Sequence, residues 1–377
     1  MALRVGVIGG GQLARMMIAP ASELGLEISV LAEEPGMSAQ LAATAVGDYR
    51  DAETVLAFAE GVDVITFDHE HVPQPVLRAL VAAGVSVHPG PEALRFAQDK
   101  LEMRARLAEL GMPQPEWAAV TTAEELDAFI SANGGRAIVK TPRGGYDGKG
   151  VRVVEAGVDA ADWFAALAED GNGGALLAEE LVDFTRELAQ QVARRPSGEM
   201  RAYPVVETVQ HGGVCAEVLA PAPHASDRLI EVAREIGIAI ADGLSVTGML
   251  AVELFETADE RLLVNELAMR PHNSGHWSQD GAVTSQFEQH LRAVLDLPLG
   301  DPAPLLPWTV MINILGGPVD GAMEDRFAAA LAAHPTAKLH TYGKAPRPGR
   351  KVGHITVTGS SLDDVAYEAR AAASHFA

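Results

Sequence analysis

The first hundred residues alternate short, β-branched apolar runs with segments of helical spacing. We predict buried strands over residues 3–8, 28–31, 62–67 and 85–87, with helices between them. This alternation is typical of a doubly wound parallel sheet, because parallel strands need helical crossovers that cover both faces of the sheet. The sequence therefore predicts an α/β class of fold that begins with a Rossmann-like domain.

The pattern changes twice further along the chain. A long helix is expected from Glu92 to Leu110, and a smaller α/β unit follows it. From Glu187 the apolar residues alternate with a period of two, which indicates antiparallel strands. A proline-rich stretch over 298–307 then leads into a last α+β segment. We expect three domains: 1–96, 97–297 with a lid subdomain at about 115–178, and 298–377.

Charge limits the partners that such a chain can bind. Its 377 residues include 29 basic and 51 acidic side chains, a formal net charge of −22. This excess of acid repels nucleic acids and anionic membranes, so we expect neither as a partner. No apolar run is long enough for a membrane helix, the N-terminus does not resemble a signal peptide, and the lone Cys215 fits a reducing compartment. The expectation is a cytoplasmic protein that holds any anionic substrate with a local basic cluster.

Two glycine-rich loops have the composition of anion-binding sites. GGGQLARM follows the first predicted strand, where backbone N–H groups and a helix N-terminus can bind a phosphate or another polar ligand. It departs from the GxGxxG pattern of dinucleotide sites at Leu13 and Ala14. The second loop, KTPRGGYDGKG, runs from Lys140 to Gly150 between two predicted strands. Its lysines and glycines suit a loop that closes over a triphosphate, although it is not a Walker loop.

Two acidic residues lie on apolar strands that are close in sequence. Glu253 lies in GMLAVELF and Glu266 in VNELAM, with Asn265 beside it. If the strands are neighbours, both carboxylates can share a magnesium ion, which prefers oxygen ligands. A carboxylate on an apolar strand is costly unless it is paired or bound to metal. The alternative reading is a pair of solvated carboxylates at a sheet edge.

Two polar segments complete the candidate chemistry. The first is a turn that follows Glu266 and is suited to a planar oxyanion such as bicarbonate; it contains Arg270, His272, Asn273 and His276. The second is a basic segment near the C-terminus, suited to a phosphate monoester; it contains Lys344, Arg347, Arg350 and Lys351. Each can also be read as ordinary surface structure.

In this order, the motifs GGGQLARM, ITFDHEHV, KTPRGGYDGKG, VNELAMRPHNSGHW and GRKVGH resemble one family over essentially the whole chain. It is the family of 5-(carboxyamino)imidazole ribonucleotide synthetases within the ATP-grasp superfamily. The resemblance implies an ATP-grasp ligase that carboxylates 5-aminoimidazole ribonucleotide with bicarbonate, through carboxyphosphate, in de novo purine biosynthesis. It also implies ATP as co-substrate, two Mg²⁺ ions and a homodimer.

The same resemblance assigns roles to individual residues of this chain. The implied ATP contacts are Arg95, Lys140, the phosphate loop Gly145, Tyr146, Asp147, Gly148, Lys149, Gly150 and Val151, the adenine hinge Glu179, Glu180, Leu181 and Val182, and Glu187, His211, Asn265 and Glu266. The implied magnesium ligands are Glu253 and Glu266. The implied catalytic residues are Arg270, His272, Asn273 and Asp147, the last as a candidate general base. The implied ribonucleotide contacts are Gly10, Gly11, Gln12, Leu13, Glu70, Lys344 and Arg350.

Three other functions stay open at this point. A sibling ATP-grasp ligase, such as the formate-using glycinamide ribonucleotide transformylase, would keep the ATP residues and change the acceptor. A nicotinamide dehydrogenase built on the first domain would bind NAD without ATP. A non-catalytic nucleotide sensor is the weakest alternative, because it needs neither paired metal carboxylates nor an oxyanion-binding turn.

Overall fold

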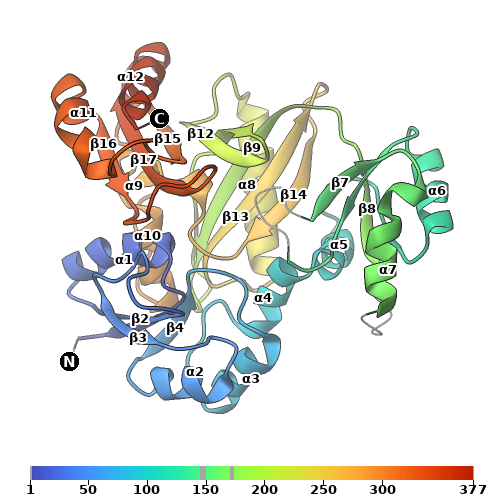
Figure 1. Cartoon of the computed structure of the whole chain (residues 1–377), viewed down its shortest axis with the longest axis horizontal. Helices are drawn as coiled ribbons and strands as arrows, with labels where there is room; N and C mark the ends of the chain where they lie inside the picture. The colour runs from blue at the N-terminus through green and yellow to red at the C-terminus, as the bar shows by residue number, and fades with distance from the viewer. Residues whose placement is uncertain (1, 145–149, 170–173, 377) are drawn as a thin grey trace.

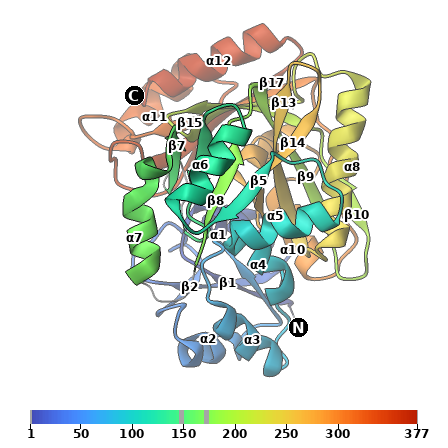
Figure 2. The same ribbon diagram turned by 90° about the vertical axis from the view of Figure 1, so that its right-hand side faces the viewer.

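The computed structural model describes residues 2–144, 150–169 and 174–376. Three sheets form the molecule: a parallel sheet at the N-terminus, a long central sheet, and a small sheet that projects to one side (Figure 1). Figure 2 views the molecule from the side of this projecting sheet. Within the described residues, no helix combines the length and the apolar character needed to cross a membrane.

The N-terminal sheet is parallel and has the strand order β3-β2-β1-β4, as the alternating pattern predicts. Its strands are β1 (Arg4–Ile8), β2 (Glu27–Ala32), β3 (Ala43–Val46) and β4 (Val64–Phe67). Helix α1 (Gln12–Glu23) packs on one face, and α2 (Ala52–Ala59) and α3 (Gln74–Ala82) pack on the other. The predicted strand over 85–87 is wrong, since Val87 forms only an isolated bridge with Ile65. Strand β3 was missed because its alanine-rich sequence carries little strand propensity.

The long helix expected from Glu92 to Leu110 is in fact two helices, α4 (Pro91–Gln98) and α5 (Lys100–Glu109). Asp99 separates the two helices and has an extended backbone conformation. Its carboxylate accepts hydrogen bonds from the backbone N–H groups of Leu101 and Glu102. An aspartate N-cap of this kind stabilises a new helix start. The second carboxylate oxygen of Asp99 accepts from Arg143 Nε at 2.8 Å. Asp99, at the break, therefore connects the helix pair to Arg143 in the glycine-rich loop.

The projecting sheet is antiparallel and has the order β5-β8-β6-β7. Its strands are β5 (Trp117–Val120), β6 (Ala137–Lys140), β7 (Val151–Val154) and β8 (Leu176–Glu180). Helices α6 (Ala123–Ala132) and α7 (Ala161–Glu169) lie beside this sheet (Figure 2). Strands β6 and β7 flank the glycine-rich loop, as the sequence predicts.

The central sheet is antiparallel and has the order β14-β13-β9-β11-β12-β15-β17-β16, with β10 paired to β9. Its strands are β9 (Phe184–Arg194), β10 (Met200–Ala202), β11 (Val206–His211), β12 (Val214–Ala220), β13 (Gly248–Thr257), β14 (Leu262–Ala268), β15 (Trp308–Leu315), β16 (Lys338–Thr341) and β17 (Lys351–Gly359). The strands after the proline-rich stretch thus continue this sheet (Figure 1). Helices α11 (Phe327–Ala333) and α12 (Leu362–Ser374) lie at that end.

Two helices fix the central sheet in place. Helix α8 (Asp227–Gly243) packs its apolar face on β9 and β13. After the short helix α9 (Ser278–Gly281), α10 (Gln286–Val294) packs against both α1 and β13. Because α10 contacts both sheets, it holds the loops of the N-terminal domain against the central strands.

One buried histidine of α10 makes the fold sensitive to acid. His290 is 0% exposed; its Nδ1 accepts from the N–H of Met249 at 3.0 Å, and its Nε2 lies 2.7 Å from Thr66 Oγ1. The ring is therefore neutral, with its proton on Nε2. Burial, with a smaller contribution from nearby His88, lowers the pKa of His290 to about 3. The unfolded chain protonates this side chain near pH 6.5, so its contribution to stability is complete above that pH and is lost as the pH falls toward 3.

We expect the replacement His290→Gln to flatten the acid side of the stability profile. Between pH 6.5 and 4, the free energy of unfolding of the wild type should lose about 1.4 kcal/mol per pH unit more than that of the variant. Urea unfolding measured across this range tests the prediction, with the exposed His224→Asn as the control. Parallel profiles for wild type and His290→Gln would contradict it.

Candidate active site

A β-bulge brings the two predicted metal-binding carboxylates together. Strands β13 and β14 pair Val252 with Leu267 and then Leu254 with Val264, so Glu253 alone faces both Asn265 and Glu266. One residue opposite two is the pattern of a bulge, which redirects side chains locally. The sequence prediction of neighbouring strands is confirmed, and the bulge explains how adjacent Asn265 and Glu266 can serve one site.

The electrostatics of this pair favour a cation. Burial, then the negative charges of Glu266 and Glu187, raise the pKa of Glu253 to about 8. A divalent ion would relieve the repulsion between the acids. In the part of the chain that the structure describes, no three His, Cys, Asp or Glu side chains form a metal cluster. The two carboxylates and the amide oxygen of Asn265 are oxygen donors of the kind that Mg²⁺ prefers, and this ion commonly completes its coordination with water and phosphate oxygens.

Lys140 joins these acids to the projecting sheet. Its Nζ lies 2.8 Å from Glu179 Oε2, 3.2 Å from Asn265 Oδ1 and 4.0 Å from Glu266 Oε1. Glu179 also accepts from Arg104 Nε at 2.5 Å, and both of these side chains are buried. Burial favours the neutral acid, but the charges of Arg104 and Lys140 outweigh it and lower the pKa of Glu179. The Glu179 carboxylate is thus occupied by two cations, which leaves the backbone of this hinge as the part able to contact an adenine.

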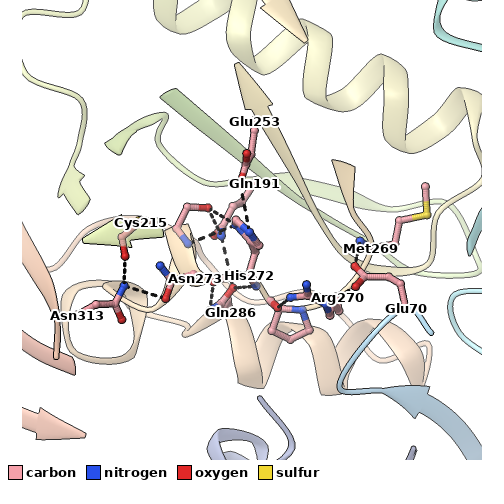
Figure 3. A network of polar contacts seen from close by, with 12 residues as sticks. Glu70, Gln191, Cys215, Glu253, Met269, Arg270, His272, Asn273, Gln286 and Asn313 are labelled. Carbon is pink, nitrogen blue, oxygen red and sulfur yellow. Dashed lines mark hydrogen bonds and ion pairs between the residues drawn. The ribbon is translucent and has the colours of Figure 1, made fainter. Parts of the chain in front are cut away.

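The turn after β14 presents polar groups to the same region. Arg270 donates from Nε to Glu70 Oε2 at 2.6 Å, and the backbone N–H of Met269 donates to Glu70 Oε1 at 3.2 Å. Glu70 follows β4, so this contact connects the N-terminal domain to the turn (Figure 3). Glu70 therefore holds the Arg270 guanidinium in place.

The next residues of the turn, His272 and Asn273, are held by contacts with other side chains of the protein. His272 Nε2 lies 3.3 Å from Glu253 Oε1, and its Nδ1 faces the Ser274 hydroxyl at 2.9 Å. Burial, then the charges of Arg270 and Lys351, lower the pKa of His272 to about 3, so the ring is neutral. Asn273 is buried, and its Oδ1 accepts from Asn313 Nδ2 at 3.1 Å (Figure 3). Arg270, His272 and Asn273 thus lie in one row, with His272 next to Glu253 (Figure 3).

Two of the residues predicted to bind the ribonucleotide contact each other although they are far apart in sequence. Lys344 donates from Nζ to Gln12 Oε1 at 2.5 Å, which places the basic loop between β16 and β17 beside the first glycine-rich loop. Arg350 lies in the same basic loop. At Gly11 a side chain is impossible, because a Cβ atom would lie 2.0 Å from Asp68 Oδ2. The side chain of Leu13 is buried in the hydrophobic core, so only its backbone can face a ligand.

The remaining predicted ATP residues lie on several different elements. Arg95 lies on α4, Val151 begins β7 opposite Lys140, and Gly150 precedes it with a φ of 69°. The hinge residues Glu180, Leu181 and Val182 lie between the projecting and central sheets; Glu187 is on β9, and His211 is exposed at the end of β11. Gly145, Tyr146, Asp147, Gly148 and Lys149 lie outside the described residues.

Three side chains of this region were not predicted as site residues from the sequence. Arg104 is fully buried behind Lys140 and Glu179, and Gln286 reaches the turn from the start of α10. Lys351, which had been grouped with the basic segment, acts electrostatically on Glu253 and His272. No local motif marks the first two, because their partners are distant in sequence.

Comparisons with known proteins identify the class to which the chain belongs. Family models match residues 1–98 (ribonucleotide synthetase preATP-grasp domain), 105–287 (ATP-grasp domain) and 309–368 (phosphoribosylaminoimidazole carboxylase C-terminal domain). The three-sheet fold and the acidic, lysine-flanked site therefore define an ATP-grasp ligase.

Relatives identify the family within that class. The N5-carboxyaminoimidazole ribonucleotide synthase of Mycobacterium tuberculosis is 50% identical and covers 98% of this chain and 86% of its own. The solved Thermus thermophilus synthetase is 38% identical with a TM-score of 0.86, covering 97% of this chain and 96% of its own. The Aspergillus clavatus enzyme, solved with ADP and 5-aminoimidazole ribonucleotide, is 31% identical with a TM-score of 0.88, covering 99% and 98%. The chain belongs to the N5-carboxyaminoimidazole ribonucleotide synthase family.

Proposed function

We infer that this protein carboxylates 5-aminoimidazole ribonucleotide in an ATP-dependent reaction of purine biosynthesis. Bicarbonate is phosphorylated by ATP to carboxyphosphate, and its carbon is then transferred to the exocyclic amine of the ribonucleotide. The products are 5-(carboxyamino)imidazole ribonucleotide, ADP and phosphate. The observation that carries this function is the convergence of Glu253 and Glu266 with Lys140 on one side and Arg270 and His272 on the other.

We propose that the nucleotide lies between the projecting and central sheets. Lys140 would neutralise phosphate charge, and the backbone of Leu181 and Val182 would contact the adenine. Glu187 is recessed on β9, where its carboxylate can accept from ribose hydroxyls. Arg95, His211 and the loop from Gly145 to Val151 would complete the ATP contacts. Positioning and charge neutralisation dominate such a reaction, because the protein forms no covalent bond with the phosphoryl group.

Glu253 and Glu266 would hold Mg²⁺, with Asn265 beside them, and the family resemblance favours two ions. A bound Mg²⁺ neutralises charge on the phosphate oxygens during transfer. His272 is neutral and its Nε2 lies 3.3 Å from Glu253 Oε1, so it would help to orient that carboxylate. The Arg270 guanidinium can pair with a planar oxyanion, and it is held in place by Glu70.

We propose that Arg270, His272 and Asn273 bind bicarbonate and carboxyphosphate next to the ATP phosphates. Carboxyphosphate hydrolyses in water, so this chemistry requires a site that excludes solvent during the reaction. The glycine-rich loop between β6 and β7 is our candidate for that closure, with Asp147 as a candidate general base. The ribonucleotide would lie across Gly10, Gly11, Gln12 and Glu70, with its phosphate on Lys344 and Arg350.

We further propose the domain boundaries 1–96, 97–297 and 298–377, a homodimeric assembly and a cytoplasmic location. The switch from parallel to antiparallel sheet supports the first boundary, and the proline-rich stretch before β15 supports the last. The dimer rests on family resemblance, and sedimentation of the purified protein tests it.

The decisive experiment measures ADP release with and without each substrate. We expect turnover that requires both bicarbonate and 5-aminoimidazole ribonucleotide, and no turnover with formate and glycinamide ribonucleotide. The reverse dependence would identify a formate-using sibling ligase. Calorimetric binding of NAD in the absence of ATP binding would instead support a dehydrogenase.

The double replacement Lys344→Ala/Arg350→Ala tests the phosphate site. Losing two charge-assisted hydrogen bonds should raise the half-saturating concentration of the ribonucleotide by about tenfold to a hundredfold, with little change for ATP. The control Arg326→Ala/Lys338→Ala removes the same charge from exposed positions of the same C-terminal segment. A larger effect on ATP than on the ribonucleotide would move the phosphate site elsewhere.

A further inference from the structure

The turn that carries His272 and Asn273 has little regular structure of its own. Only a short 3₁₀ turn, Asn273–Gly275, forms there, with backbone hydrogen bonds from Gly275 N to His272 O and from His276 N to Asn273 O. So short an element cannot fix the direction of its side chains by itself. The side chains around it must therefore define its conformation.

One buried amide contacts this turn at three points. The side chain of Gln286, 0% exposed, accepts from the backbone N–H of His272 at 2.9 Å and donates to the His272 carbonyl at 2.8 Å. Its Nε2 also lies 2.8 Å from His276 Nδ1. Gln286 thus binds both backbone polar groups of His272 (Figure 3). It also contacts the His276 side chain at the far end of the turn.

Gln286 is itself held rigidly. Its backbone N–H donates to Ser278 Oγ at 2.9 Å, and that hydroxyl donates to the Gly275 carbonyl at 2.6 Å. The amide also approaches Gly275 so closely that a Cβ atom there would lie 2.4 Å from Gln286 Oε1. The start of α10 and the turn are therefore closely packed and joined by hydrogen bonds.

The orientation of His272 follows from this packing. Gln286 fixes its backbone, and the Ser274 hydroxyl and N–H face Nδ1 at 2.9 and 3.4 Å. The proton of the neutral ring then lies on Nε2, which points at Glu253 Oε1 at 3.3 Å. Arg270, two residues earlier, is restrained by Glu70. Gln286 and Glu70 thus anchor the turn on its two sides.

We propose that Gln286 is a positioning residue for the bicarbonate step: it fixes the turn that presents His272 and its neighbours to bicarbonate and carboxyphosphate. This inference rests on the proposed function. Gln286 acts through His272 and needs no contact with substrate. Reactive groups that are displaced by about 1 Å can lose about 100-fold in rate, so an indirect contact of this kind can have a large kinetic effect.

The same helix offers a matched control. Gln289 is also 0% exposed, and its side chain donates to the Gly300 carbonyl at 2.9 Å and accepts from the Gly300 N–H at 2.7 Å. It therefore clamps one residue's backbone from both sides, as Gln286 does, but in the segment before β15. The same replacement at Gln286 and at Gln289 removes a similar pair of buried hydrogen bonds. Only the replacement at Gln286 affects the turn that carries His272.

The test compares Gln286→Glu with Gln289→Glu. Glutamate keeps the acceptor oxygen but replaces the donor N–H₂ with a second acceptor, which faces the His272 carbonyl. ADP release is measured against bicarbonate in carbon dioxide-free buffer and, separately, against ATP. Thermal unfolding and the concentration of active sites are recorded for both variants. If Gln286→Glu does not fold, the same measurements are made on Gln286→Asn, which keeps the amide group on a side chain that is one carbon shorter.

We expect Gln286→Glu to lower kcat/KM for bicarbonate by tenfold or more, with the half-saturating ATP concentration within about twofold of wild type. Gln289→Glu should leave kcat/KM for bicarbonate and the half-saturating bicarbonate concentration unchanged. A merely structural role would reduce the active fraction without changing the half-saturating bicarbonate concentration, and that result would overturn the inference. Equal kinetics for the Gln286 and Gln289 variants would also overturn it. Absence of bicarbonate-dependent turnover in the unmodified enzyme would instead refute the proposed function.

Discussion

Replacement of Glu266 by glutamine should reduce turnover at saturating substrates by at least about 100-fold, which is a loss of about 2.7 kcal/mol of transition-state stabilisation. The substitution keeps the size of the side chain and removes its charge. Without that charge, Glu253 is the remaining carboxylate of the β13–β14 pair, and a divalent ion bound there loses half of its anionic protein ligands. The side chain of Glu266 is 39% exposed, so the fold should tolerate the change.

A charge change in the same hairpin provides the control. Glu260 is exposed in the turn between β13 and β14, and Glu260→Gln removes the same charge without touching the site. ADP release titrated with Mg²⁺ should show a weaker metal dependence and a much lower maximum for Glu266→Gln only. A wild-type rate with a wild-type Mg²⁺ dependence would show that Glu266 is not a metal ligand.

The paired acids were predictable because each lies on a strand that its own sequence defines. GMLAVELF and LLVNELA are apolar enough to be recognised as strands, and only four residues separate them in the structure. A connection that short makes an antiparallel pair the expected arrangement. The bulge opposite Glu253 was not predictable, because it depends on the register of two strands rather than on the sequence of either.

Features that depend on distant partners were missed. The helical spacing from Glu92 to Leu110 is uninterrupted, and the break at Asp99 exists because that carboxylate caps α5 and binds Arg143. Glu179 was assigned to the adenine hinge, where its strand lies, but its carboxylate is held by Lys140 and Arg104. The Asp99–Arg143 contact joins residues 44 positions apart and the Arg104–Glu179 contact joins residues 75 apart, and local patterns do not encode such contacts.

Replacement of Arg104 by leucine should destabilise the protein by about 3–5 kcal/mol, the largest change in stability expected for any residue of this site. The Arg104 side chain is 0% exposed and donates to Glu179 Oε1 at 2.5 Å and to the carbonyls of Val264 and Asn265, both at 2.7 Å. Leucine would leave two buried carbonyls without donors and a buried carboxylate with one cation instead of two. The projecting and central sheets would lose a direct connection at the same point.

Arg106 is the matched control for this prediction, two residues along on α5. It pairs with Glu109 at 2.7 Å, but these side chains are 36% and 65% exposed, so Arg106→Leu should cost no more than about 1 kcal/mol. Denaturant unfolding of both variants gives the comparison. Arg104→Lys should fall between them, because an ammonium keeps the charge but cannot reach three acceptors with a planar fork. Equal destabilisation by the two leucine variants would mean that Arg104 connects the sheets no more strongly than a surface ion pair does.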